Sequence, residues 1–161
     1  MALVKGVNSY VTFDESEAYF IDRANEKWIT YTEEQRDQAL VTATKMLDRL
    51  SWGGYSAAAT QPLAFPRLLR YFDITYGRNV SLDGTESEAP NRVKEAVYEL
   101  AHHILSDTDV IDSTPDASGL RIAGSVSLFD IRKAPRIPYY VIDIIRPLLS
   151  SVSTGAIKVN Y

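Results

Sequence analysis

The chain has 161 residues, of which 45% are hydrophobic and 24% charged, the composition of one ordinary globular domain. It contains no cysteine, which excludes thiol catalysis, cysteine-ligated metals and a disulfide framework. The formal net charge is −4, so indiscriminate binding to nucleic acid is disfavoured. No apolar run approaches the roughly 20 residues of a membrane span, and the first residues lack the layout of a secretory signal, so we expect a cytoplasmic protein with no membrane partner.

The charge is distributed unevenly along the chain. Residues 1–119 carry 11 basic and 19 acidic side chains, whereas residues 120–161 carry six basic and two acidic ones. Such asymmetry suggests a charged partner for one face. Mixing of the two signs on the folded surface is an equally good alternative.

The first helix is expected to begin at one of two overlapping capping boxes. Thr12 with Glu15, or Asp14 with Glu17, would satisfy the free amide groups at its start, and the helix would run to about residue 25. The apolar side of this helix would comprise Phe20, Ile21 and Ala24. Trp28, just beyond the helix, would be an aromatic anchor.

A clearer capping box, Thr32 with Gln35, predicts a helix over residues 33–50. Its apolar side chains recur every three or four residues, so one stripe of this helix should be buried. They are Ala39, Leu40, Ala43, Met46, Leu47 and Leu50.

Residues 51–89 contain many helix-breaking residues and are expected to form an ordered loop region. Gly53 and Gly54 end the preceding helix, because paired glycines are costly inside one. The aromatic side chains in this region are too many for a disordered linker. We expect them to pack over the helices, around one short helical turn near residues 67–72.

Two further helices are predicted after this region. Pro90 opens an amphipathic helix that ends near residue 107, and Pro138 opens a last helix that Pro147 kinks or ends. Between them, Ile122, Val126 and Leu128 alternate with small side chains, which predicts a strand or hairpin.

These elements predict a mainly α fold in a single domain of residues 1–150. It would be a bundle of about four helices with a small β element at about 120–131. Residues 151–161 would form an extended C-terminal arm. Its expected contact residues are Ile157, Lys158, Val159 and Tyr161. The arm could pair with a sheet of another subunit or protein, or with residues 120–131 of its own chain.

Patterns that indicate catalysis or cofactor binding are absent from the sequence. The only histidines, His102 and His103, are adjacent on a helix and point about 100° apart, so they cannot form the i, i+4 pair of a helical metal site. No nucleophile turn, phosphate-binding loop or dinucleotide glycine pattern occurs. We expect no catalytic residue, no metal and no cofactor, and therefore no enzyme.

One segment has the composition of a surface that binds single-stranded DNA. Arginines interleave with aromatic rings over residues 67–78, and guanidinium groups beside stacking rings are how single strands are held. The candidate residues are Arg67, Arg70, Tyr71, Tyr76 and Arg78. Alternatively, these side chains would pack in the core, and only the cationic ends of the arginines would reach solvent.

Several short stretches, in order and spacing, resemble a known protein family. They are Gly6-Val7-Asn8-Ser9-Tyr10-Val11, Ala18-Tyr19-Phe20, Gln38-Ala39-Leu40, Leu47-Asp48, Trp52-Gly53-Gly54, Gln61-Pro62-Leu63-Ala64-Phe65-Pro66-Arg67, Pro90, Val93, Lys94, Ala96 and Glu99-Leu100-Ala101. Over roughly residues 6–105 the chain resembles the head-to-tail adaptor (connector, head-completion) proteins of tailed bacteriophages. Members of that set are also often catalogued as DnaT-like proteins that bind single-stranded DNA.

The resemblance implies a structural virion protein, made in the host cytoplasm, that forms a closed ring of roughly twelve copies. The ring would join the portal protein of the capsid to the next neck or tail protein. Duplex DNA would pass through its lumen without specific binding, because an acidic surface weakens contacts with phosphates. The alternative is a single-stranded-DNA-binding accessory protein of phage replication.

Overall fold

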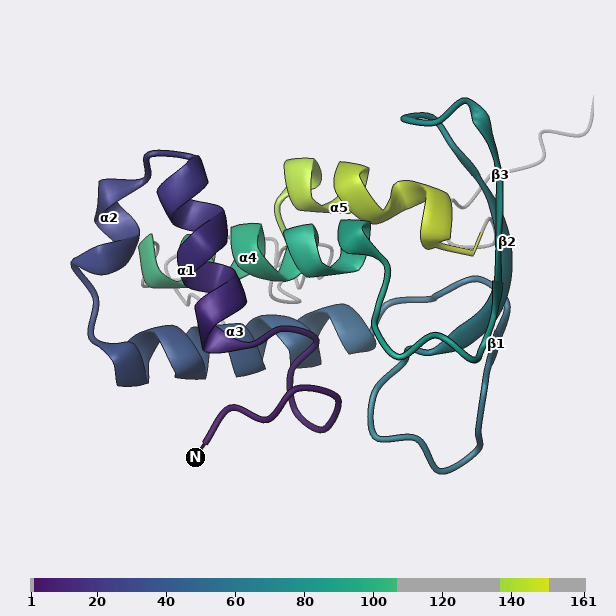
Figure 1. Ribbon diagram of the computed structural model, residues 1–161, viewed down its shortest axis with the longest axis horizontal. Coiled ribbons are helices and arrows are strands. Elements are labelled where there is room, and N and C mark those ends of the chain that lie inside the picture. Colours follow the sequence, from purple (N-terminus) through teal and green to yellow (C-terminus); the bar gives the residue numbers. More distant parts are fainter. Residues whose placement is uncertain (1, 107–136, 151–161) are drawn as a thin grey trace, which may run out of the picture.

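The computed structural model describes residues 2–106 and 137–150, which form a group of packed helices with a small antiparallel sheet at one end (Figure 1). The helices are α1 (Phe13–Asp22), α2 (Glu26–Ile29), α3 (Glu33–Asp48), α4 (Asn91–Ser106), α5 (Tyr139–Ile145) and a 3₁₀ turn, η4 (Arg146–Leu148). The strands are β1 (Tyr55–Ser56), β2 (Arg67–Asp73) and β3 (Arg78–Asp83), in the order β1-β2-β3.

Local hydrogen bonds start α1 where the sequence predicts. The Thr12 hydroxyl accepts a bond from the Glu15 amide, and the Glu15 carboxylate accepts one from the Thr12 amide, which confirms this capping box. The helix ends at Asp22, earlier than expected, and Ala24 beyond it has a φ of 50°. The predicted apolar side is wrong at Ile21, which is 69% exposed, and at Ala24, which is exposed and lies beyond the end of the helix.

The short helix α2 was not predicted, but its Trp28 was predicted to be an aromatic anchor. Trp28 is fully buried and stacks on Phe20, with 4.2 Å between ring centroids. The Trp28 indole nitrogen donates to the Glu17 carboxylate at 2.7 Å. The polar end of this anchor is thus satisfied while its ring fills the core.

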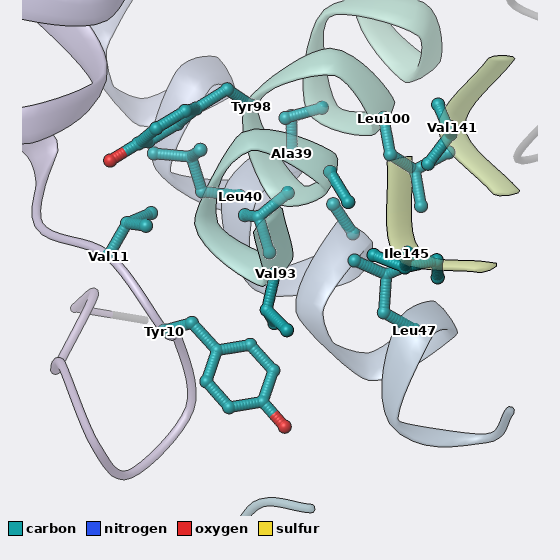
Figure 2. Packing of buried hydrophobic residues seen from close by; sticks show 14 of the residues in the cluster. Tyr10, Val11, Ala39, Leu40, Leu47, Val93, Tyr98, Leu100, Val141 and Ile145 are labelled. Carbon is teal, nitrogen blue, oxygen red and sulfur yellow. The ribbon is translucent and has the colours of Figure 1, made fainter. Parts of the chain in front are cut away.

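The centre of the core lies between α3 and α4, which run side by side (Figure 1). The Thr32–Gln35 capping box of α3 is confirmed, and the buried stripe that follows it includes Leu40 and Leu47. Figure 2 shows Val93 and Leu100 of α4 pointing into the same interior as these leucines. As predicted, the last helix begins after Pro138. It gives way to η4 at Arg146, and Pro147 is the second residue of η4.

The expected fold class, a helical bundle whose only β element lies at about 120–131, is wrong. Residues 51–89 hold a three-stranded antiparallel sheet, so the fold is mixed. The helical turn expected near residues 67–72 is instead β2, the central strand. The predicted strand at 120–131 and the arm at 151–161 lie outside the described residues.

The physical reason for this correction is that β2 carries apolar side chains on both of its faces. Leu69 and Tyr71 point toward the core while Leu68 and Phe72 point to solvent, which hides the alternation typical of a half-buried strand. The breakers interpreted as loop signals mark the ends of strands instead. Gly77 lies in the β2–β3 turn, and Gly84 follows β3.

Candidate nucleic-acid interface

One face of the sheet packs on the helices and the other faces solvent. Residues paired across an antiparallel sheet project to the same side. Leu68 pairs with Asp83, Arg70 with Ser81 and Phe72 with Asn79. Tyr55 of β1 pairs with Leu68 and is 80% exposed. We call these residues the outer sheet face: Tyr55, Leu68, Arg70, Phe72, Asn79, Ser81 and Asp83.

The turn between β2 and β3 extends this surface with further apolar and basic groups. Ile74 is 76% exposed and Tyr76 is 65% exposed. The guanidinium of Arg78 lies 5.7 Å from the centre of the Tyr76 ring, a cation–π contact. We call residues 74–78 the hairpin tip.

Two arginines of the β2–β3 hairpin have their guanidinium groups available for a ligand. In the part of the chain that the structure describes, neither Arg70 nor Arg78 makes a hydrogen bond or an ion pair, and both are exposed. Phe72, 53% exposed, lies on the same face as Arg70, and Tyr76 contacts Arg78. Arg78 pairs with Asp73 and therefore projects from the side of the sheet opposite Arg70. The hairpin thus offers one ring beside one cation at two places: Phe72 with Arg70 on the outer sheet face, and Tyr76 with Arg78 at the hairpin tip.

Two of the five residues predicted to contact single-stranded DNA lie on the opposite side of β2 from Arg70, where Arg67 is half-buried and Tyr71 is buried. Arg67 donates from Nε to the Gly53 carbonyl at 2.9 Å and from its terminal nitrogens to the carbonyls of Gly54 and Ala64. Tyr71 is only 9% exposed, and burial raises the pKa of its hydroxyl. Strand alternation thus separates Arg67 and Tyr71 from Arg70.

The sequence-based analysis missed three exposed side chains of this surface, Tyr55, Leu68 and Ile74, and its list of five contact residues leaves out Phe72 although this ring belongs to the same arginine–aromatic segment. A period of two counted from Arg70 would have found Leu68 and Phe72. Tyr55 reaches the surface only because β1 pairs with β2, which no local pattern indicates.

An ion pair fixes the base of the hairpin tip to the helices. Arg92 of α4 donates to both carboxylate oxygens of Asp73, at 2.7 and 3.0 Å, and also to the Ile144 carbonyl and the Thr75 hydroxyl. Hydrogen bonds from Arg92 hold the pKa of Asp73 well below its usual range. The tip is therefore anchored at the point where it leaves the sheet.

The two histidines lie on α4 and have aromatic neighbours on α1 and α5. The His102 ring lies 5.7 Å from Phe20, and burial lowers the pKa of its imidazole. His103 contacts Tyr140 edge-on. Within residues 2–106 and 137–150, no group of three or more His, Asp or Glu side chains is placed to hold a metal ion. Over the same ranges, no helix has both the length and the apolar character needed to cross a bilayer.

Comparison with curated proteins and with solved structures finds no significant match. A family model described as "Putative DnaT-like ssDNA binding protein" matches residues 2–160. The comparisons thus support the DnaT-like designation, whereas the resemblance to phage adaptors receives no support from them. Because the match spans nearly the whole sequence, the chain belongs to this DnaT-like family.

Proposed function

We propose that this protein binds single-stranded DNA across its outer sheet face and hairpin tip. The observation that carries the proposal is an exposed ring beside an unpaired guanidinium at two places, Phe72 with Arg70 on the helix-free sheet face and Tyr76 with Arg78 at the hairpin tip. Phe72 and Tyr76 would stack on bases, and Arg70 and Arg78 would contact phosphates. Membership of the DnaT-like family supports the same class of ligand.

The composition of this surface sets the expected balance of forces. Only two unpaired cations face the strand, on a protein whose net charge is −4. Two phosphate contacts give a salt slope, d log K/d log [salt], of about −1.4 for a single strand. Stacking, worth about 1–3 kcal/mol per base, must therefore supply most of the affinity.

The test is a fluorescence-anisotropy titration of a labelled oligo-dT strand and of a duplex of equal length. We expect binding to the single strand only, with the shallow salt slope given above. Phe72→Ala should weaken binding by about 5- to 150-fold, the loss of one stacked base. Arg70→Glu should also weaken binding, because it puts a repulsive charge in place of an attractive one. The loss of affinity should grow as the salt concentration is lowered, because low salt screens this charge less.

A charge reversal elsewhere provides the matched control for these variants. Lys27 is exposed on α2, at the opposite end of the molecule from the sheet (Figure 1). Lys27→Glu changes the net charge as much as Arg70→Glu does, so it should leave oligo-dT binding nearly unchanged. If the two variants weaken binding equally, or if duplex and single strand bind alike, the proposed site is wrong.

The second candidate function is that of a structural subunit in a ring between a phage head and its tail. The observation that favours it is the apolar character of the same surface, where Leu68, Ile74 and Tyr55 are exposed on an acidic protein. Under this proposal the partners are further copies, a portal protein and a neck or tail protein, with duplex DNA passing through unbound and no reaction catalysed. Imaging of the protein mixed with portal rings would then reveal added density of matching symmetry, and oligo-dT would not bind.

A further inference from the structure

We infer that the bound strand bends sharply around the hairpin tip, and that the protein therefore selects single strands whose bases stack weakly on one another, such as oligo-dT. The inference rests on the proposed function and deepens it, because it names the class of strand that fits the site. It follows from where the β2–β3 hairpin holds its two pairs of ring and cation.

The two pairs lie on opposite sides of the hairpin. Phe72 and Arg70 lie on the outer sheet face. Arg78 pairs with Asp73, one residue pair closer to the turn, and therefore projects from the other side. The centre of the Tyr76 ring lies 5.7 Å from the Arg78 guanidinium, so this ring belongs to the second pair. A strand that contacts both pairs must pass around the hairpin.

The closed end of the hairpin is open to such a strand. Ile74 and Tyr76 are 76% and 65% exposed, and a Cβ placed on Gly77 would meet nothing within 4 Å. In the part of the chain that the structure describes, β1 pairs with β2 only at Arg67 and Leu68, at the end away from the turn. The described residues therefore leave a path from the outer sheet face around the hairpin tip.

The hairpin is held in place, so the strand has to bend and not the protein. Asp73 accepts two bonds from Arg92 and one from the Thr75 amide. Arg92 also donates to the Thr75 hydroxyl and to the Ile144 carbonyl, which fixes the base of the tip to α4 and α5. Bringing Arg78 to the outer sheet face would require a one-residue shift in the pairing of β2 with β3.

The bend is tight because the hairpin is narrow. Neighbouring strands of a sheet lie only about 4.8 Å apart, so a strand that rounds two of them changes direction within a few nucleotides. Consecutive bases have to unstack at such a bend. Thymines stack weakly on each other and leave the backbone flexible, whereas adenines stack into a stiffer strand. Differences of this kind, in stacking and flexibility, set the base preferences of single-strand sites.

Strand length separates contact with one pair from contact with both. A short strand reaches a single ring, where oligo-dA should bind at least as tightly as oligo-dT because the adenine ring is larger. A longer strand can engage the second pair as an intramolecular contact. Oligo-dT should then gain about 5- to 150-fold in affinity, the effect of one further stacked base. Oligo-dA should gain much less, so the preference reverses with length.

The experiment is an anisotropy titration of the full chain with labelled oligo-dT and oligo-dA of about 4 to about 16 nucleotides, the usual range of single-strand site sizes. For oligo-dT we expect a step in affinity at the length that spans both pairs. Tyr76→Ala should remove the step and the reversal of preference but leave binding of the shortest strands unchanged. Tyr76→Phe keeps the ring and should keep both effects.

The matched control truncates an exposed apolar side chain elsewhere. Ile29 is 60% exposed on α2, at the opposite end of the molecule from the sheet (Figure 1), and Ile29→Ala should behave as the unaltered chain does. A smooth rise with length, tighter binding of oligo-dA at every length, or a step that survives in Tyr76→Ala would each overturn the inference and leave the proposed function standing. If no strand of any length binds, the proposed function fails and the inference fails with it.

Discussion

Asp73 is the residue through which the exposed hairpin is fastened to the helices. It is 3% exposed, accepts both bonds of a two-pronged contact from Arg92 and also accepts the amide of Thr75. Because Arg92 in turn donates to the Ile144 carbonyl, one guanidinium joins β2, α4 and α5. Removing the carboxylate therefore leaves a guanidinium with fewer partners at a junction of three elements.

The lowered pKa of Asp73 makes a prediction about acid. A carboxyl whose folded pKa lies below its unfolded value stabilises the fold above the unfolded pKa, and that contribution is lost as pH falls toward the folded pKa. Asp73→Asn should therefore lower the Tm at about pH 7. The difference in Tm between the variant and the unaltered chain should become smaller below about pH 4. Thermal melts followed by circular dichroism at several pH values measure this. A gap that is constant across pH would mean that the Asp73 charge contributes nothing.

At the scale of elements, the sheet depends on close backbone approach where β1 meets β2. Gly54 has a φ of +64°, and a Cβ placed there would lie 2.0 Å from the Leu68 carbonyl oxygen. Arg67 reinforces the same junction through its bond to the Gly54 carbonyl. The outer sheet face thus depends on a residue that contributes no side chain to it.

Gly54→Ala should destabilise the protein by more than ~1 kcal/mol, because it combines backbone strain with a clash against backbone. Gly77→Ala is the matched control. Gly77 also has a positive φ, of +60°, but a Cβ there would meet nothing within 4 Å. Urea denaturation should therefore show a clearly larger loss for Gly54→Ala. Equal losses would indicate that the contact at Leu68 is readily relieved.

At the scale of the whole molecule, one core connects the two ends. Its buried residues run from Tyr10 near the start of the chain to Leu148 in η4, and they include Trp52 and Tyr71 from the sheet region. The end of η4 is joined to the segment that precedes the sheet, because the Gly53 amide donates to the Leu148 carbonyl at 2.9 Å. Among the residues that the structure describes, the core extends to Leu148.

Ending the chain after Ser150 should therefore change the Tm by less than the roughly 2–4 °C that corresponds to 1 kcal/mol in a protein of this size. Leu148→Ala, at a fully buried position, should cost about 2–5 kcal/mol and serves as the positive control in the same calorimetric scans. A truncated chain that melts as low as Leu148→Ala would show that the arm belongs to its own core.

The sequence by itself determined the features that depend on neighbours a few residues apart. The Thr12–Glu15 and Thr32–Gln35 capping boxes, and the proline that precedes the last helix, place helix starts through bonds that close within one turn. The buried stripes of α3 and α4 follow from helical periodicity alone. These contacts are local, so the residues that make them can be recognised in the linear sequence.

Only the tertiary structure decided the sheet and the surface it carries. Tyr55, Arg70 and Asn79 share one face because three segments pair across the sheet, and Arg67 turns inward because carbonyls of the 53–64 region lie there to receive it. A strand with apolar side chains on both sides looks like a loop or a helical turn until its partners are known. Pairing between distant segments decides which side of the strand faces solvent and is open to a ligand, and which side packs in the core.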